Sequence, residues 1–554
     1  MHPESNPAPA ARPTSAQAAQ KFYIKTFGCQ MNVADSERMA ALLAEQGMTP
    51  ADEVEDAHVI ILNGCTVREK AVHKAISTLG SYHKAGRKNA IKPVIGIGGC
   101  VGQLEKEQLF KQAPYLDFVF GTDTIDNLPE IVNRVQNGEK HVVFADFDKS
   151  MDYSTETKVH GHKAQAFVNI MKGCDKYCSY CIVPFTRGRE KSRTIDEVVF
   201  DVARLVAGGV REVTLLGQNV NSFGKGNENV KKREPQELNN IIGKVGPRAG
   251  EENFPQLLRA IDQDPRCVNL KRIRFTSSHP LDFSDELINC YATPEKGGVA
   301  KLSPHLHLPV QSGSNRVLQK MGRHHRIEHY FAQMERLREL NPEVGITTDL
   351  IVGFPTETEE EFEETIKLLD RVQYYNIFAF AYSPRPGTRA AKLPDDVPDS
   401  VKNERLNRLL QHQLEISGRN FAECVGKTYE ILVEGEARNQ NLVEKNRVEK
   451  NRVEKGTAAE IESGAKPVAA GGRVWMGRTG CNRVVNFVSD SNRNLLGKFF
   501  DVKIIAASRL SLQGELVVTP TFAEDAANAK VEFSNPMSAL SNPMSELMTS
   551  EVVS

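Results

Sequence analysis

The sequence of 554 residues lacks the features of a membrane or secreted protein. No apolar run approaches the roughly 20 residues that a membrane-spanning helix needs. Residues 1–20 contain no apolar segment of the secretory type, so we expect a disordered lead-in there. Ten cysteines are too few for a disulfide scaffold in so long a chain, which favours a cytoplasmic protein with reduced thiols. The net charge of −1 means that nucleic-acid binding would have to rely on local basic patches.

The most informative absence is that of a fourth ligand beside three closely spaced cysteines. The segment MKGCDKYCSYC contains Cys174, Cys178 and Cys181, and no histidine follows at the distance that completes a zinc finger. Thiolates select zinc, copper(I) or iron–sulfur clusters, and a cluster that only carries electrons would need a fourth thiolate. Three ligands leave one position of a cluster open, and an open position allows chemistry.

A second set of cysteines follows the predicted strands of residues 21–138. This region alternates strand-like and helical segments, which predicts a doubly wound α/β domain with a parallel sheet. Cys29, Cys65 and Cys100 follow the strands KFYIKTF, HVIILN and PVIGIGG. Groups just beyond the carboxyl ends of such strands share one crevice, so we expect these cysteines to converge. Three unrelated buried cysteines are the alternative.

The middle of the chain has the pattern of a partial barrel. After a predicted linker, 139–165, residues 166–399 contain six strand candidates, each followed by helical or loop sequence. This pattern predicts a TIM-like (β/α)6 barrel whose site lies at the carboxyl ends of its strands. The three-cysteine segment directly follows the first strand. The charged, glycine-rich stretch 225–252 is predicted to be a surface loop.

Four further residues follow strands of this barrel and are candidate cofactor contacts. Gly217 and Gln218 follow the second strand, and Gln311 and Ser312 follow the fourth. The alternative for both pairs is a tight turn between a strand and the next helix.

The last part of the chain is predicted to be a small antiparallel β-barrel, a shape that often binds RNA. A helix over 400–424 leads to five short strand-like runs within 425–518. Residues 436–472 contain the repeat NLVEK-NRVEK-NRVEK and are expected to form a solvated insert. Residues 519–554 are expected to be a disordered tail.

Two groups of arginines are candidate contacts to RNA phosphates, with a solvated charge run as the alternative. One group lies beside the three-cysteine segment and the other flanks strands of the small barrel: Arg187, Arg189 and Arg193, and Arg473, Arg478 and Arg483.

The CxxxCxxC spacing after the first strand of a partial barrel resembles the radical S-adenosylmethionine (SAM) superfamily. Within that superfamily, the chain resembles the methylthiotransferases. The segments that carry this resemblance are TFGCQMNVADSE, ILNGCTVREKA, IGGC, CSYCIVPFTRGRE and HLPVQSGS. The segment GRTGCNRVVNF looks like the TRAM RNA-binding module of that family. The match covers about residues 21–518, apart from the two inserts.

The resemblance implies two [4Fe-4S] clusters and SAM as cofactors. The trio Cys174, Cys178 and Cys181 would hold the cluster that binds SAM, and the trio Cys29, Cys65 and Cys100 would hold an auxiliary cluster. SAM cleavage would give a radical that removes hydrogen from C2 of N6-isopentenyladenosine beside the anticodon, and C2 would then receive a methylthio group. The implied partners are a tRNA anticodon arm and an electron donor such as a flavodoxin or ferredoxin. We expect a monomer without membrane contact.

Two alternatives stay open. Related methylthiotransferases act on threonylcarbamoyl-adenosine in tRNA or on an aspartate of a ribosomal protein. The sequence GCQMN in place of GCPKN, with TRGRE and GRT…NRVVNF, favours the isopentenyladenosine branch. The second alternative is a non-catalytic RNA-binding protein with structural metal. It would need closed four-ligand sites, and both trios lack a fourth ligand nearby.

Overall fold

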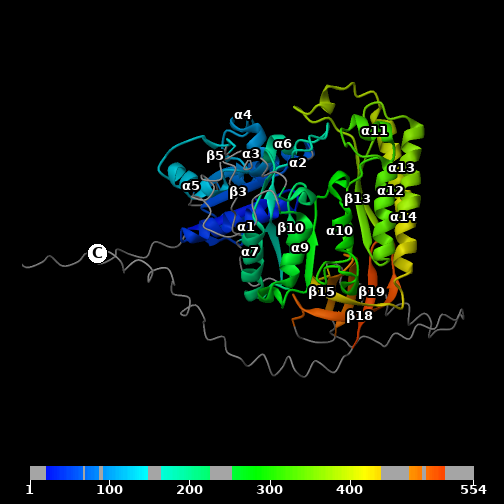
Figure 1. Ribbon diagram of the computed structural model, residues 1–554. Helices are drawn as coiled ribbons and strands as arrows, with labels where there is room; N and C mark the ends of the chain where they lie inside the picture. The colour runs from blue at the N-terminus through cyan, green and yellow to red at the C-terminus, as the bar shows by residue number, and fades with distance from the viewer. Residues whose placement is uncertain are drawn as a thin grey trace, which may run out of the picture.

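Three domains make up the described part of the chain (Figure 1). The structure, a computed structural model, describes residues 20–66, 69–86, 92–147, 157, 164–224, 252–437, 473–489 and 494–517. The predicted lead-in, surface loop, repeat insert and tail lie outside these ranges, apart from their border residues. Within these ranges, no helix is both long and apolar enough to cross a membrane.

The N-terminal domain is a parallel six-stranded sheet with helices on both faces, as predicted. Its strand order is β2-β1-β3-β4-β5-β6. The strands are β1 (Lys21–Thr26), β2 (Thr49–Pro50), β3 (Val59–Gly64), β4 (Val94–Gly98), β5 (Phe118–Phe120) and β6 (Val142–Phe144). One face carries α1 (Gln30–Glu45) and α5 (Leu128–Gln136); the other carries α2 (Glu69–Gly86), α3 (Gly99–Glu105) and α4 (Gln108–Gln112).

Strand β3 shows why this sequence forms a central strand. Its run VIILNG is buried along its whole length, which is typical of parallel strands covered on both faces. Val59 and Ile61 pack on the side of α1 and α5, whereas Ile60 and Leu62 pack on the side of α2 and α3. The alternation of side chains along a strand therefore supplies both apolar layers.

The predicted linker 139–165 is wrong at its beginning. Strand β6 is the edge of the N-terminal sheet and runs parallel to β5, with Phe118 opposite Val142. Three residues are too few to show a strand periodicity in the sequence, so only the tertiary partner identifies this strand.

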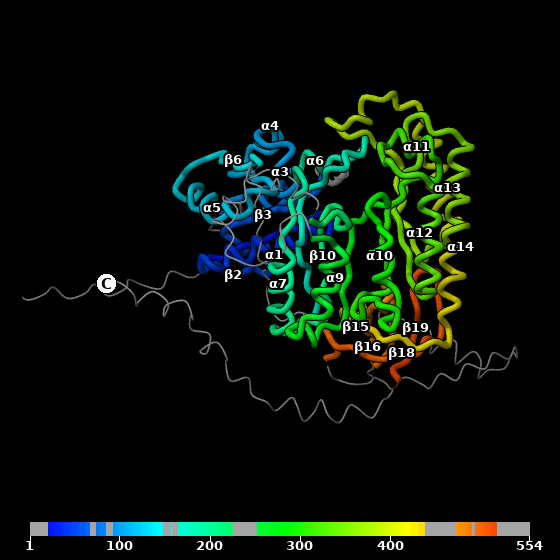
Figure 2. The backbone as a smooth tube through the Cα atoms, in the orientation of Figure 1, coloured from blue at the N-terminus to red at the C-terminus, as the bar shows by residue number. Residues whose placement is uncertain are grey.

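The middle domain contains all six predicted barrel strands, and all run parallel. They are β7 (Gln165–Asn169), β10 (Glu212–Leu216), β11 (Arg272–Phe275), β12 (His305–His307), β13 (Gly345–Val352) and β14 (Asn376–Ala381). They form two three-stranded sheets, which a parallel bridge between Ile273 and Leu302 joins. The covering helices include α7 (Ile195–Ala207), α9 (Phe254–Gln263), α10 (Asp285–Asn289), α12 (Ile327–Leu340) and α13 (Glu359–Val372) (Figure 2).

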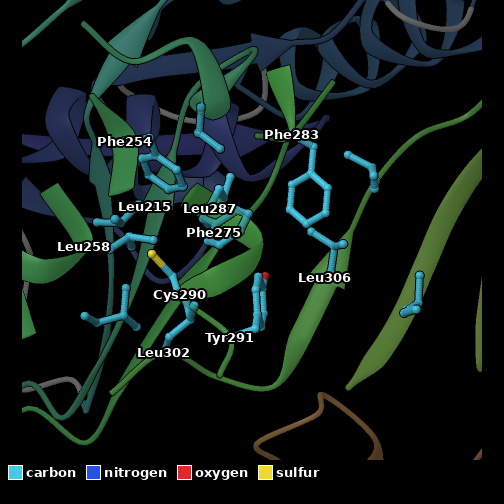
Figure 3. Close-up of a cluster of buried hydrophobic side chains, with 14 of the residues drawn as sticks. Leu215, Phe254, Leu258, Phe275, Phe283, Leu287, Cys290, Tyr291, Leu302 and Leu306 are labelled. Carbon is cyan, nitrogen blue, oxygen red and sulfur yellow. The ribbon is translucent and has the colours of Figure 1, made fainter. Parts of the chain in front are cut away.

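The core of this partial barrel is apolar between strands β10 and β11 and helices α9 and α10. Figure 3 shows Leu215, Phe254 and Phe275 gathered around the side chain of Cys290. Cys290 is fully buried, and its thiol contacts the backbone oxygen of Glu286 at 3.4 Å. This cysteine is therefore a core residue.

The C-terminal domain is a closed five-stranded barrel that follows α14 (Asp399–Ala422). The ring order is β15-β16-β17-β19-β18. Its strands are β15 (Thr428–Glu436), β16 (Arg473–Thr479), β17 (Val484–Ser489), β18 (Phe499–Ala507) and β19 (Leu512–Leu516). The predicted small barrel is confirmed, with four antiparallel pairings and one parallel pairing, between β17 and β19. A closed ring with an odd number of strands cannot alternate in direction all the way round.

The small barrel lies against the amino-terminal ends of the larger barrel's strands, below the partial barrel in Figure 1. Gln165 begins β7 and donates to Glu434 at 3.3 Å. Arg272 begins β11 and donates to the backbone oxygen of Arg478 at 3.1 Å. The small barrel therefore closes the end of the partial barrel opposite to the carboxyl ends.

Candidate metal centres

The structure brings Cys29, Cys65 and Cys100 to the carboxyl ends of three adjacent strands, as predicted. β1, β3 and β4 are neighbours, and each cysteine follows the end of its strand by one to three residues. A parallel bridge joins Gly64 and Gly99, the residues just before Cys65 and Cys100. The order 2-1-3-4-5 is that of flavodoxin-like folds, where the ligand binds at the switch between the first and third strands.

Small and amide side chains hold the loops of this N-terminal trio together. Gly28 has φ +146°, and a Cβ there would lie 2.9 Å from the Cβ of Cys65, so only glycine fits. The fully buried side chain of Asn63 donates to the backbone oxygen of Asn32 at 2.8 Å. It also accepts from the side-chain amide of Asn32 at 3.0 Å. The loop after β3 is thereby fixed to the first turn of α1, which Cys29 precedes.

The second trio lies in one loop between β8 (Met171–Lys172) and α6 (Val183–Arg187). β8 pairs with β9 (Lys191–Ser192), which closes the base of this loop. The amide of Cys181 donates to the carbonyl of Cys178 at 3.0 Å, so these two cysteines share one turn. The backbone of Ser179 donates to Met321 at 2.8 Å and accepts from Ala390 at 2.7 Å. The loop is therefore anchored to the later half of the barrel.

Two side chains from elsewhere in the barrel reach this cysteine loop. Gln218, a predicted cofactor contact, accepts a hydrogen bond from the amide of Gly173. Its neighbour Gly217 leaves room for the side chain of Met171. The buried Arg323 places Nη1 3.6 Å from the sulfur of Cys178 and also donates to the carbonyl of Pro309. Sequence reasoning missed Arg323, although the basic run GRHHR was a visible signal.

Buried polar side chains lie in the segments that follow the barrel strands. The polar atoms of such side chains are normally hydrogen-bonded. Several have no hydrogen-bond partner among the described residues: Asn219 Oδ1, both side-chain polar atoms of Asn221, His279 Nε2, Gln311 Oε1, Arg323 Nε and His325 Nε2. Gln311 also has φ +82°, a conformation rare outside glycine and typical of functional sites. Ser312 is fully buried, and its hydroxyl accepts from the amide of Ser314 at 3.2 Å, as in a tight turn.

The two buried histidines at this end are neutral. Burial lowers the pKa of His325 to about 4, and the neighbouring Arg323 contributes to this shift. Burial also lowers the pKa of His279, again with a contribution from Arg323. Nδ1 of His279 accepts from the amide of Leu281 at 3.1 Å, so the assigned neutral tautomer carries its proton on Nε2. That Nε2–H group is a buried donor available to a ligand.

Among the described residues, no three His, Cys, Asp or Glu side chains are arranged to hold one metal ion. An iron–sulfur cubane binds each thiolate through a different iron, so its ligands stand apart. Burial, with repulsion from Cys178, raises the pKa of Cys181 to about 12, and a bound cationic cluster would offset the cost of forming this thiolate.

The predicted phosphate contacts beside the cysteine loop are wrong for Arg187 and Arg193. Arg187 forms a buried ion pair with Asp35 at 2.7 Å, and Arg193 forms one with Asp201 at 2.9 Å. A guanidinium enclosed with a carboxylate cannot reach an RNA backbone. Arg189 is 65% exposed and pairs with Asp175 at 2.6 Å, so its phosphate contact stays a prediction.

The arginines of the small barrel also differ from one another. Arg473 and Arg478 pair with Glu436 and Glu434, at 2.9 and 3.1 Å, and their RNA contacts stay predictions. Arg483 instead packs over the ring of Tyr375, 5.5 Å from its centroid, and donates to the thiol of Cys481. These contacts place Arg483 in the interface with the larger barrel, which does not favour phosphate binding.

Comparisons with known proteins match both cysteine-bearing domains. Residues 21–121 match the Uncharacterized protein family UPF0004, and residues 168–369 match the Radical SAM superfamily. Relatives named tRNA-2-methylthio-N(6)-dimethylallyladenosine synthase include that of Myxococcus xanthus, which is 44% identical over 90% of this chain and 94% of its own. That of Bdellovibrio bacteriovorus is 39% identical over 89% and 95%. The solved radical S-adenosylmethionine methyltransferase TsrM of Kitasatospora setae has a TM-score of 0.47 at 13% identity, covering 68% of this chain and 77% of its own.

Proposed function

The chain belongs to the tRNA-2-methylthio-N(6)-dimethylallyladenosine synthase family of radical SAM enzymes, and from this premise we propose its reaction and its cofactor sites. The chain transfers a methylthio group to C2 of N6-isopentenyladenosine beside the anticodon of tRNA. The observation that carries this proposal is a pair of three-cysteine sites in two domains that contact each other through α3 and α6. The chain also covers 94–95% of the length of relatives named for this reaction.

The trio Cys174, Cys178 and Cys181 would hold a [4Fe-4S] cluster with one open iron. When bound, such a cluster supplies the electron with which radical SAM enzymes cleave SAM. The chain itself anchors the loop through Ser179 and places Arg323 beside the sulfur of Cys178.

The trio Cys29, Cys65 and Cys100 would hold a second cluster, which serves sulfur delivery. Removal of hydrogen from a base and delivery of sulfur to the same carbon need different groups, held at close range. Helix α6 begins just after Cys181 and packs against α3, which contains Cys100. The two sites thus face one region, which suits a base taken out of its stack.

The buried neutral groups at the barrel's carboxyl end suit an uncharged base. His279 offers an N–H donor, and Asn221 and Gln311 offer further unpaired polar atoms. The isopentenyl group is apolar and needs no charged partner. The choice of isopentenyladenosine over threonylcarbamoyl-adenosine is supported by the relatives, which are named tRNA-2-methylthio-N(6)-dimethylallyladenosine synthase.

The substrate is tested with the full-length chain, reconstituted with iron and sulfide without oxygen, and one tRNA prepared with and without the prenyl group. We expect methylthiolation of the prenylated tRNA alone. Equal modification of both tRNAs, or modification only of a tRNA with threonylcarbamoyl-adenosine, would contradict the proposed substrate.

The cofactor sites are tested by iron analysis. Two clusters correspond to about eight iron atoms per chain. Replacing Cys174, Cys178 and Cys181 by Ala should roughly halve the iron and abolish deoxyadenosine formation. Replacing Cys29, Cys65 and Cys100 by Ala should also halve the iron but spare SAM cleavage. The control is Cys290→Ala, a buried cysteine among apolar side chains, which should retain all the iron (Figure 3). Unchanged iron in either triple variant would refute the ligand assignment. The electron donor and the monomeric state stay predictions.

A further inference from the structure

Arg187 joins the two cysteine sites. It is the last residue of α6, the short helix that begins two residues after Cys181. Its guanidinium lies in the N-terminal domain's site, 2.7 Å from the carboxylate of Asp35, and both side chains are less than 10% exposed. The positive charge of Arg187 also opposes the effect of burial, which raises the pKa of the Cys100 thiol. A residue of the barrel therefore completes the surroundings of a cysteine in the other domain.

Further contacts hold α6 in this position. The hydroxyl of Thr122 donates to the carbonyl of Thr186 at 2.7 Å. Lys172, just before the cysteine loop, pairs with Asp123 at 3.0 Å, and Asp123 is only 4% exposed. Five helical residues rise about 7 Å in total, so α6 is a short and rigid spacer. One end of this spacer carries the barrel's cysteine loop, and the other end reaches Cys100.

We propose that Arg187 is a positioning residue with two roles, and this inference rests on the proposed function. It fixes the distance between the two cluster sites, and it places a positive charge beside the ligand Cys100. The planar guanidinium has several donors in fixed directions, so it can engage Asp35 and Cys100 together. A lysine in its place would keep the charge but could not hold both partners in this geometry.

The spacing matters because the hydrogen is removed at one site and the sulfur is delivered from the other. A misplacement of about 1 Å in an arrangement of reacting groups can cost about 100-fold in rate. The charge matters because Asp35 alone would repel the thiolate of Cys100 inside a buried site. Arg187 therefore allows a carboxylate and a thiolate to lie close together.

The first test is a double-mutant cycle on the full chain without iron. Its variants are Arg187→Met, Asp35→Asn and both together, and it measures the unfolding equilibrium constant in urea. We expect the unfolding equilibrium constant of the double variant to be about tenfold smaller than the two single effects together predict, because neither charge is then left buried alone. If the effects of the two substitutions on stability simply add, the inferred contact between Arg187 and Asp35 across the domains would be refuted. This cycle does not depend on iron binding.

The second test measures the N-terminal cluster in full chains whose Cys174, Cys178 and Cys181 are Ala. The midpoint potential of the remaining cluster, followed by electron paramagnetic resonance, should fall in the Arg187→Met/Asp35→Asn variant and stay nearly unchanged in Arg187→Lys. The matched control is Arg193→Met/Asp201→Asn, an equally buried ion pair within the barrel, which should not move the potential. A potential unaffected by the loss of Arg187, or moved as much by the control, would overturn the charge role.

The third test uses the complete chain with both clusters. Arg187→Lys should lower the methylthio product formed per deoxyadenosine about tenfold or more, because the charge remains while the position is lost. An unchanged ratio would overturn the positioning role. Failure of the proposed function would be seen separately, as an absence of iron at the N-terminal trio in the chain with Arg187 intact. The iron-free cycle would then still decide whether Arg187 joins the domains.

Discussion

Arg274→Met should weaken the attachment of the small barrel to the larger one. Arg274 lies in the buried interface between them and is 7% exposed. Its Nη1 and Nη2 donate to the carbonyls of Gly480 and Thr479, at 2.9 and 2.8 Å, and its Nε lies 3.0 Å from Glu212. Methionine fills a similar volume but supplies none of these contacts.

The cost follows from what the substitution leaves behind. Glu212 is 4% exposed and would keep only Arg272 as a charged partner, at 3.6 Å. Removing one partner of a buried ion pair costs about 3–5 kcal/mol, and two backbone acceptors also lose their donors. With a urea dependence of about 2 kcal/mol per molar, the unfolding midpoint should fall by about 1.5–2.5 M.

The chain's single tryptophan makes this effect measurable. Trp475 lies in the core of the small barrel and is 3% exposed, so its fluorescence reports the unfolding of that domain. The iron-free chain avoids absorption by clusters. Arg266→Met is the control, because Arg266 pairs with Asp264 at the protein surface, where solvent screens the two charges. A midpoint for Arg274→Met within the range of this control would refute the reasoning.

Three further predictions concern the sites. The pKa of His325 is about 4 in the folded chain and about 6.5 in the unfolded chain, so the unfolded chain binds more protons between these pH values. The free energy of unfolding should therefore fall as the pH drops from 6.5 to 4. In urea titrations His325→Asn should lose less stability over this range, and equal losses in both proteins would contradict the prediction. Asn63→Ala breaks buried hydrogen bonds at the N-terminal site and should cost about 2–4 kcal/mol, read from the unfolding of that domain; a cost below about 1 kcal/mol would contradict the role of this network. Gly28→Ala places a Cβ against Cys65 and should reduce the iron bound at the N-terminal trio. The control is Gly47→Ala, because Gly47 also has a positive φ, +80°, but has open space around it, so this variant should retain the iron. Equal iron in both variants would argue against the steric role of Gly28.

The convergence of the N-terminal cysteines could be predicted because it depends on chain direction alone. Parallel strands place their carboxyl ends at one edge, so Cys29, Cys65 and Cys100 needed only correct strand assignments. Five of the six barrel strands were visible because they are longer than the three residues of β6, whereas β12 is as short as β6. The parallel pair in the small barrel also followed from the odd number of strands, although the sequence interpretation overlooked it.

The roles of the arginines could not be predicted, because burial depends on distant partners. Arg187, Arg189 and Arg193 alternate in one short run and look alike in the sequence. Asp35 on α1 and Asp201 on α7 bury two of them, whereas Arg189 remains 65% exposed. Local sequence contains no information about which of these acids will face which guanidinium. The Arg187–Asp35 pair forms only where the two domains dock, and the Arg193–Asp201 pair forms only when the barrel folds.

The position of the small barrel limits which parts of a bound RNA each domain could contact. Its strands lie at the amino ends of the larger barrel, and the cysteine loop lies at the carboxyl ends (Figure 1). The eight residues of β13 span about 26 Å, so RNA that contacts Arg473 and the cysteine loop together must extend over at least that length. Near the cysteine loop, Tyr177 and Phe185 are 44% and 46% exposed, and unstacked bases stack on such aromatic rings. We therefore propose that the carboxyl end of the barrel selects the modified base, and that the small barrel contacts more distant parts of the tRNA. Because the small barrel also covers Arg274, its removal would damage the larger barrel, so point substitutions of exposed arginines are the sound way to measure its share of RNA binding.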